Sequence, residues 1–308
     1  MLSRVADSLY WTARYLERAE HTARVLDVHL HLVLDLEPAA AQERWKRVLR
    51  TLNAGDDQTP EKLTFDAGDP CSVVSCIGVA RENARQIREQ ISSEMFEELN
   101  RLYLYVRDPE TRERFAVEPH AFFVAVKEGA HLFQGITDST MTHGQGFRFI
   151  QVGRLMERAG AVASMAHQHL IPLLSASEPE QNYLEMLGLL KACTAWEAYC
   201  KVYSADLQVD RMADFLLLHP EFPHSVHYCV ERLYRALQAI AEETGVRAAR
   251  DLNKIAGGVR ARLRYQRIEE VLSDSLERFL NRVRGRLAEI HEGIFSIYVA
   301  DQLTEVLQ

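Results

Sequence analysis

Apolar residues recur every seven positions along the first part of the chain. One series consists of Leu2, Leu9, Leu16, Ala23 and Leu30, and a companion series of Val5, Thr12, Ala19, Leu26 and Val33. Seven residues are about two turns of an α-helix, so both series lie on one face and form a narrow apolar stripe. The pattern predicts a single long helix over residues 3–36, with Ser3 as its N-cap and Pro38 beyond its end.

Helical spacing also governs the rest of the chain. The segments with this spacing are 40–53, a stretch beginning near Pro70, a stretch after Ser92 or Ser93, 120–136, 144–174 up to about Pro172, and several further segments from 183 to 299. Strict alternation of apolar and polar residues, the mark of a half-buried strand, does not persist anywhere. The sequence therefore predicts an all-α protein.

Three predictions concern breaks and continuity within this pattern. The polar, glycine- and proline-containing stretches 53–70 and 175–180 predict a loop and a linker. Gly257 and Gly258 predict a break in the helix that contains them. The apolar segment 183–203 instead predicts one continuous buried helix, with Cys193 and Cys200 on a single face.

The motif R-x-x-E-R-A occurs twice, at residues 14–19 and 154–159. At the corresponding offset of 140, identical residues also recur around it, among them Ala23 with Ala163 and His29 with His169. Later landmarks keep their order while the offset drifts to 150–158, as for Ser72-Val73-x-x-Cys76 and Ser225-Val226-x-x-Cys229. This pattern predicts an internal duplication. We expect halves at 1–140 and 141–308, related by a pseudo-two-fold and packed as one body.

The repeated motif supplies six candidate site residues: Arg14, Glu17, Arg18, Arg154, Glu157 and Arg158. One reading is a solvated helix surface, where such pairs contribute little. In the second copy, however, the polar neighbours are replaced by apolar residues, such as Phe147 at the position of Asp7. Charges on an apolar helix need a partner. The alternative is a shared cluster between the halves, either an ion-pair network or a site for a phosphate or carboxylate group.

Composition limits the functional classes. The chain has 308 residues with a formal net charge of −8, which does not suit a protein that coats DNA or an anionic membrane. It contains no run of eighteen apolar residues and starts without a secretory signal pattern, so we expect a cytoplasmic protein. Five cysteines without a C-x-x-C motif indicate free thiols, most of them buried.

One basic stretch interrupts this acidic balance. Residues 247–267 hold seven Arg or Lys residues and a single Asp. The stretch is either a solvated helix face or a contact for tRNA, a nucleotide or an acidic partner.

Motifs for metal or cofactor chemistry are weak. Glu128-x-x-His131 has the spacing of a carboxylate-bridged metal site, but the second half offers no matching ligands, so we expect no metal. Phosphate-binding glycine loops and a G-x-S-x-G elbow are also missing from the sequence. We therefore expect no cofactor and favour a protein that is not an enzyme.

Several segments together resemble the bacterial alpha-E family. They are ARYLERAEHTARVLD, ARENARQIREQISSEMFEELNRLY, GRLMERAG and ACTAWEAYCKVYSADLQVDRMADFLLLHPEFPHSV. The resemblance implies an all-helical fold and places the family's Glu-Arg signature at Glu17-Arg18 and Glu157-Arg158. Glu231-Arg232 is a possible third copy, although Tyr228 replaces the upstream arginine.

The resemblance also implies a biological setting. Members of the family are commonly encoded beside, or fused to, a circularly permuted ATP-grasp ligase, often near a transglutaminase-like protease. We therefore expect an accessory or scaffold partner of a peptide or amide ligase system. The alternative is an enzyme component that acts directly through the Glu-Arg cluster. The substrate, the docking surface and the oligomeric state stay open.

Overall fold

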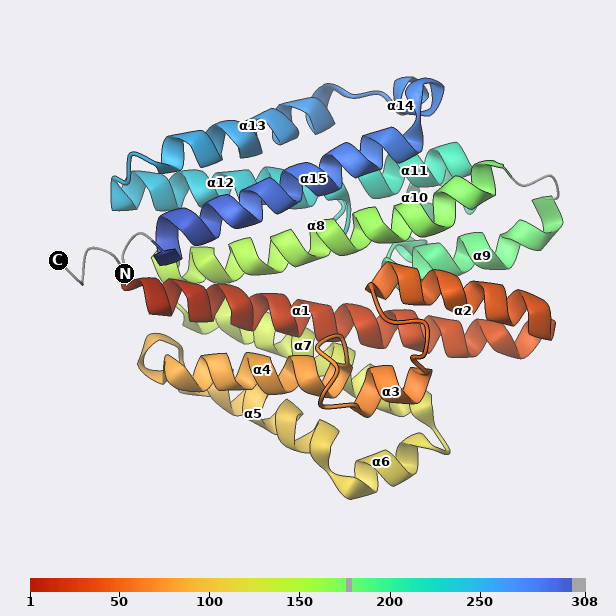
Figure 1. The fold of residues 1–308 in the computed structure, drawn as a ribbon, viewed down its shortest axis with the longest axis horizontal. Helices are drawn as coiled ribbons and strands as arrows, with labels where there is room; N and C mark the ends of the chain where they lie inside the picture. The colour runs from red at the N-terminus through yellow and green to blue at the C-terminus, as the bar shows by residue number, and fades with distance from the viewer. Residues whose placement is uncertain (176–178, 301–308) are drawn as a thin grey trace.

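A computed structural model describes residues 1–175 and 179–300 of the chain. Within this part, the secondary structure consists of fifteen α-helices and three short helical turns, with no strand (Figure 1). The all-α prediction is therefore confirmed.

Two long helices form the centre of the molecule. Helices α1 (Ser3–Leu32) and α8 (Gln145–Leu174) each have 30 residues and run side by side (Figure 1). The predicted stripe on α1 is buried, with Leu9, Leu16 and Leu26 at most 2% exposed. Helix α1 ends four residues before the predicted 36, because Val33–Asp35 continue as a 3-10 turn.

A set of helices packs on each side of this central pair (Figure 1). Helices α4 (Val73–Gln86), α5 (Ser93–Arg107) and α7 (Pro119–Thr140) complete a bundle with α1. Helices α12 (Val226–Thr244), α13 (Ala249–Tyr265) and α15 (Leu276–Phe295) complete a bundle with α8. Helices α4 and α12 start in the same way, because the hydroxyls of Ser72 and Ser225 accept hydrogen bonds from the N–H groups of Ser75 and Tyr228.

Shorter helices connect and cover these bundles. They are α2 (Pro38–Leu52), α3 (Pro60–Phe65), α6 (Pro109–Phe115), α9 (Pro179–Ala192), α10 (Trp196–Tyr203), α11 (Val209–Leu218) and α14 (Ile268–Asp274), with turns at Arg88–Gln90 and Ser296–Ala300. Helices α2 and α9 each contact both α1 and α8, and Arg44 of α2 forms an ion pair with Glu185 of α9 at 2.6 Å. These two helices therefore tie together one end of the central pair.

The central helices approach closely at Gly153. A Cβ atom on this residue would lie 2.2 Å from the backbone oxygen of Tyr10 in α1. Any larger residue would push the helix backbones apart, so Gly153 allows α1 and α8 to meet at this height.

Helix α8 ends at Leu174, as predicted, with Pro172 inside its last turn, where its missing N–H removes only one hydrogen bond. Three other local predictions were wrong. The stretch 53–70 contains α3, which begins at Pro60, where a proline suits the first turn. Gly257 and Gly258 lie within a continuous α13. Residues 183–203 form two helices, because Thr194 adopts a left-handed φ of 56°. Most of the predicted 175–180 linker falls at 176–178, outside the described residues.

All five cysteines are free thiols in the structure. Cys76, Cys193 and Cys229 are buried, whereas Cys71 and Cys200 are half-buried. Burial raises the pKa of the thiols of Cys76, Cys193 and Cys229 to about 12. These three thiols therefore stay protonated at neutral pH and act as small apolar side chains.

Candidate functional site

The two copies of R-x-x-E-R-A face each other between α1 and α8. Arg14, Glu17 and Arg18 come from α1, whereas Arg154, Glu157 and Arg158 come from α8. Arg14, Arg18 and Glu157 form one ion-paired group across the helix interface, and Glu17 and Arg158 form a second, to which Gln134 connects Arg154. We call these six residues together the Glu-Arg cluster.

Glu157 accepts hydrogen bonds from two arginines of α1. The Nε atom of Arg14 lies 2.7 Å from its Oε2 atom, and the Nε atom of Arg18 lies 2.6 Å from its Oε1 atom. Burial alone would raise the pKa of Glu157, but the charges of Arg14 and Arg18 outweigh it and lower that pKa. Glu157 therefore stays ionised, with both oxygens occupied.

Glu17 has the corresponding partner in α8. The Nε atom of Arg158 lies 2.5 Å from its Oε1 atom, and the Nη2 atom lies 3.1 Å from its Oε2 atom, so the contact is bidentate. Only 3% of the Glu17 side chain and 10% of the Arg158 side chain are exposed. Burial opposes the charge of Arg158, but Glu17 outweighs it and raises the pKa of Arg158. This ion pair is almost completely shielded from solvent, and its two hydrogen bonds fix the relative orientation of the two side chains.

The pairing is reciprocal. Glu17 of the first motif binds Arg158 of the second, and Glu157 of the second binds Arg18 of the first. Each glutamate therefore binds an arginine of the other motif. Among the described residues, neither glutamate forms an ion pair with an arginine of its own motif.

Arg154 is the exception to this reciprocity. Its Nη1 atom donates to the Oε1 atom of Gln134 in α7 at 3.2 Å, and its Nε atom is buried without a hydrogen-bond partner. Gln134 in turn donates to Glu17 at 3.2 Å. Among the described residues, no carboxylate lies within ion-pair distance of Arg154. Desolvation, reinforced by the charge of Arg158, lowers the pKa of Arg154.

Aromatic residues surround the α1 side of the cluster. The guanidinium of Arg14 lies 4.9 Å from the ring centroid of Trp11 and 5.5 Å from that of Tyr10. The hydroxyl of Tyr10 lies 2.8 Å from the Nδ1 atom of His291 in α15. The sequence did not predict the roles of His291 and Gln134, which belong to neither copy of the motif.

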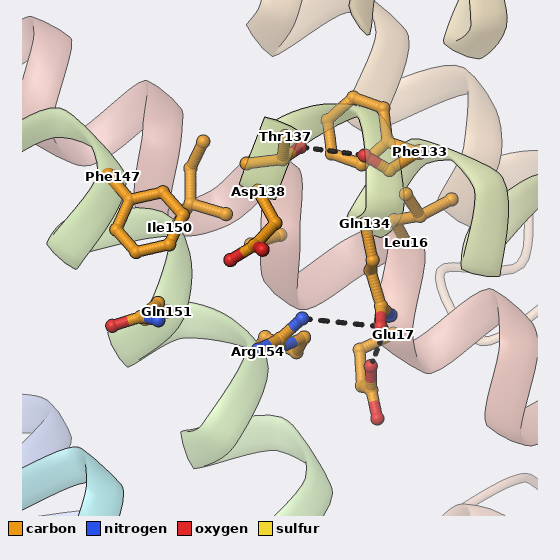
Figure 2. Close-up of a pocket in the computed structure, with 11 residues that line it drawn as sticks. Leu16, Glu17, Phe133, Gln134, Thr137, Asp138, Phe147, Ile150, Gln151 and Arg154 are labelled. Carbon is orange, nitrogen blue, oxygen red and sulfur yellow. Dashed lines mark hydrogen bonds between the residues drawn. The ribbon is translucent and has the colours of Figure 1, made fainter. Parts of the chain in front are cut away.

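A small pocket opens beside the unpaired arginine. Figure 2 shows Arg154, Gln134 and Glu17 at one end, and Phe147 and Ile150 at the other. The cavity has a volume of about 30 Å³, and Ala13, Leu16, Phe133, Thr137, Asp138 and Gln151 complete its lining. The pocket therefore combines an apolar wall with one uncompensated cation.

Among the described residues, Glu128 and His131 belong to no group of three potential metal ligands. His131 instead lies 3.7 Å from Glu20, which is paired with Arg24. Three ligand atoms do gather elsewhere, on Asp27, His31 and His120, all within 4.8 Å of one another. The second oxygen of that aspartate, however, lies 2.6 Å from the ammonium of Lys127.

The predicted basic stretch forms one side of a surface groove. The groove lies between α13 and α15, has a volume of about 660 Å³, and is lined by Lys254, Ile255, Gly258, Val259, Arg262, Leu263, Phe279, Arg282, Val283, Gly285, Arg286 and Glu289. Part of the basic charge is neutralised, because Arg260 pairs with Glu231 at 2.6 Å. The groove itself combines four cationic side chains with an apolar floor.

In the part of the chain that the structure describes, no helix has both the length and the hydrophobicity needed to cross a bilayer.

The fold and the cluster define an all-helical protein whose two central helices are joined by reciprocal glutamate–arginine pairs. The family comparison places the chain more specifically. Residues 1–299 match the model of the Alpha-E family, described as a predicted alpha-helical domain with a conserved ER motif, and the chain belongs to that family.

Three curated relatives are similar over nearly the whole chain. An uncharacterised protein of Mycobacterium bovis and one of Mycobacterium tuberculosis are each 25% identical over 332 aligned positions, and a second from M. tuberculosis is 24% identical. Each alignment covers 98% of this chain but 36% of the relative. The chain thus spans about a third of the length of these relatives. No solved structure matches the chain.

Proposed function

We propose that this protein is a non-catalytic accessory or scaffold partner of an ATP-grasp-type peptide or amide ligase system in the cytoplasm. The observation that supports a partner protein is the length of the curated relatives, because the matching unit makes up 36% of each of these longer chains. A unit that is joined to further protein in its relatives is suited to work beside a second protein component. The family resemblance favours an ATP-grasp ligase as that partner, with a transglutaminase-like protein as the second candidate.

The chemistry of the Glu-Arg cluster supports a scaffold. General acid–base catalysis needs a carboxyl group whose pKa lies near the working pH, and a nucleophile needs an activating base. Glu157 instead has a lowered pKa and two guanidinium partners. Burial raises the pKa values of the thiols of Cys76 and Cys229 to about 12, and it also raises the pKa of the Cys71 thiol. A structural role, in which the ion pairs hold the two long helices together, explains this arrangement without requiring a catalysed reaction.

We further propose that the two halves, 1–140 and 141–308, arose by duplication and are related by a pseudo-two-fold. The order of helices supports this, because α1, α4, α5 and α7 are followed by α8, α12, α13 and α15 with the same neighbours in each set. The reciprocal ion pairs also support it, since exchange of partners is what a two-fold produces. Co-expression of the halves as separate chains should recover a folded complex, whereas independently folded halves that do not associate would contradict one fused body.

The groove between α13 and α15 is the docking surface that we assign to the partner. Lys254, Arg262, Arg282 and Arg286 line it. Three of these cations pair with carboxylates, Lys254 with Asp251, Arg282 with Asp274 and Arg286 with Glu289, whereas Arg262 has no ion-pair partner among the described residues. An apolar floor with a cationic rim suits an amphipathic acidic helix, whose apolar face would enter the groove. We therefore expect the ligase to contribute an acidic helical segment.

A pull-down from the native host tests the partnership. The tagged full-length chain should recover an ATP-grasp ligase, identified by mass spectrometry. Arg262→Glu combined with Arg286→Glu should remove the ligase, because reversed charges repel an acidic segment. Arg112→Glu combined with Arg114→Glu is the matched control on exposed α6, and it should retain the ligase. Loss in both variants would contradict the groove, and a ligase absent from every sample would contradict the partnership.

The alternative function is an enzyme component that acts directly in peptide or amide chemistry. The pocket beside Glu17 and Arg154 favours it, because a cation next to a cavity can hold a reacting carboxylate. ATP-dependent coupling of an acid and an amine by the purified chain would support this alternative. Such turnover should then be lost in Arg154→Gln.

A further inference from the structure

The Glu-Arg cluster contains more positive than negative charge. It has four arginines and two glutamates, and three of the arginines are bound to those glutamates. Among the described residues, the hydrogen-bond partner of the fourth, Arg154, is the neutral Gln134, at 3.2 Å. Burying a charged group without a counter-ion is costly, and the Nε atom of Arg154 is buried without a hydrogen-bond partner.

Arg14 and Arg154 hold the same position in the two motifs but have different hydrogen-bond partners. Arg14 occupies the same position in the first motif and donates to Glu157, which Arg18 also binds. The matching contact, from Arg154 to Glu17, is not made; Gln134 instead lies between them, accepting from Arg154 and donating to Oε2 of Glu17, both at 3.2 Å. In the first motif both arginines therefore reach the carboxylate of Glu157, whereas in the second motif Arg158 reaches the carboxylate of Glu17 and Arg154 does not.

We propose that the pocket beside Arg154 binds a single carboxylate group, with Arg154 as its counter-ion and the apolar wall receiving a short aliphatic stem. The ligand is thus a small aliphatic acid or the C-terminus of a peptide, which share this chemistry. The proposal goes beyond the scaffold function, because it concerns a ligand bound by this chain alone.

The size and polarity of the cavity favour a carboxylate. Its volume of about 30 Å³ holds roughly two water-sized groups, the size of two carboxylate oxygens, so the carboxylate would enter the cavity and the aliphatic stem would lie at its mouth. Gln151 lines the same cavity and offers an amide donor, while Phe147 and Ile150 form its apolar wall (Figure 2).

The acidic residue at the pocket restricts the charge of the ligand. Asp138 lines the cavity with a side chain that is 73% exposed, and Glu17 lies on the opposite side, already bound to Arg158. These carboxylates repel a dianion more strongly than a monoanion. A carboxylate is therefore favoured over a phosphate group.

Calorimetric titration of the full chain tests the site. The probes are sodium propionate, N-acetyl-alanyl-alanine with a free C-terminus, and the same dipeptide as its C-terminal amide. At least one of the two acids should bind, and the amide should bind roughly ten- to a hundredfold more weakly than the dipeptide acid if the peptide is the form that binds. Binding of propionate alone identifies a free acid, and binding of the dipeptide acid identifies a peptide terminus. Absence of binding by both acids at millimolar concentration overturns the proposal.

Variants on one helix locate the site. Arg154→Gln should weaken acid binding roughly ten- to a hundredfold, because it removes the charged donor. Arg148→Gln removes the same charge six residues earlier on α8, where the arginine pairs with Glu243, and it should leave binding unchanged. Equal affinity of wild type and Arg154→Gln would overturn the proposal. So would sodium chloride or phosphate binding more tightly than either acid and depending on Arg154.

A conservative variant guards against loss of folding. Arg154→Lys keeps the charge but loses the planar fork, so it should fold and bind the acid with an affinity between those of wild type and Arg154→Gln. Near-ultraviolet circular dichroism checks that both variants retain native packing. A folded Arg154→Lys that binds as wild type does would show that the guanidinium makes no specific contact with the acid and would contradict the proposed site.

Discussion

The carboxylate of Glu17 and the guanidinium of Arg158 meet between the two central helices, with 2.5 Å between Oε1 and Nε. The pair is almost completely buried and is repeated, with the roles of the helices exchanged, by Glu157 and Arg18. Buried pairs of this kind contribute less net stability than their short distances suggest, but the loss of one member leaves the other charge stranded. Removing one member of such a pair should therefore cost more stability than the intact pair contributes.

Removal of Glu157 should strand two arginines. Glu157→Ala leaves Arg14 and Arg18 without a carboxylate, and we expect it to lower the free energy of unfolding by about 3–5 kcal/mol. Urea melts of wild type and variant measure this difference. Glu82→Ala is the control, because Glu82 pairs with Arg85 at the surface and its loss should change stability by about 0.5 kcal/mol or less. Similar effects of the two substitutions would contradict a buried ion-pair network.

Gly153 and Gly160 on the same helix should respond in opposite directions. Gly153→Ala places a methyl group 2.2 Å from the Tyr10 backbone oxygen, and we expect it to destabilise the protein by about 1–3 kcal/mol. Gly160→Ala meets nothing within 4 Å and should stabilise α8 by about 0.5–1 kcal/mol. Thermal melts of both variants provide the measurement. A neutral or stabilising Gly153→Ala would mean that α1 and α8 lie farther apart.

The buried His29 should make stability fall in mild acid. Desolvation, reinforced by Arg44, lowers its pKa from 6.5 to about 4, so its neutral form is favoured in the folded state. The unfolded chain then binds the proton first, and stability that is present above pH 6.5 is lost as the pH falls toward 4. Between pH 7.5 and 5, wild type should lose about 2 kcal/mol more than His29→Gln. Urea melts at the two pH values measure this difference, and parallel losses would contradict the prediction.

The ligand atoms of Asp27, His31 and His120 should not retain a metal. The Nδ1 atoms of His31 and His120 lie 3.4 and 2.7 Å from Oδ1 of Asp27, but the Lys127 ammonium already neutralises that carboxylate. We therefore expect less than one equivalent of zinc after purification and dialysis, measured by elemental analysis. Lys127→Ala should strengthen zinc binding by removing the competing cation. Stoichiometric zinc in wild type that is lost in His120→Ala would contradict this expectation.

Periodicity predicted the long helices because it is a local consequence of burial along one face. The stripe through Leu9 and Leu16 is buried as expected. Helix interruptions were harder to predict, because they depend on tertiary packing. Thr194 adopts a left-handed conformation that its side chain does not favour, and the two glycines of α13 do not interrupt their helix.

The sequence also identified the six charged residues, since their repetition on an apolar helix is visible without a structure. It could not assign the pairs, because which guanidinium reaches which carboxylate depends on how α1 and α8 are placed. Gln134 illustrates this limit. It lies on α7, outside both motifs, yet its amide bridges Arg154 and Glu17 through two hydrogen bonds.

The exchange of arginines between the two motifs has a consequence for ancestry. A contact that recurs with its partners swapped is isologous, the form that a two-fold dimer of identical subunits requires. Under the proposed duplication, a precursor of half the present length needed only one glutamate and one arginine to join two copies of itself. Gene fusion then freed each half to change separately, and the lone guanidinium of Arg154 marks a place where they have diverged.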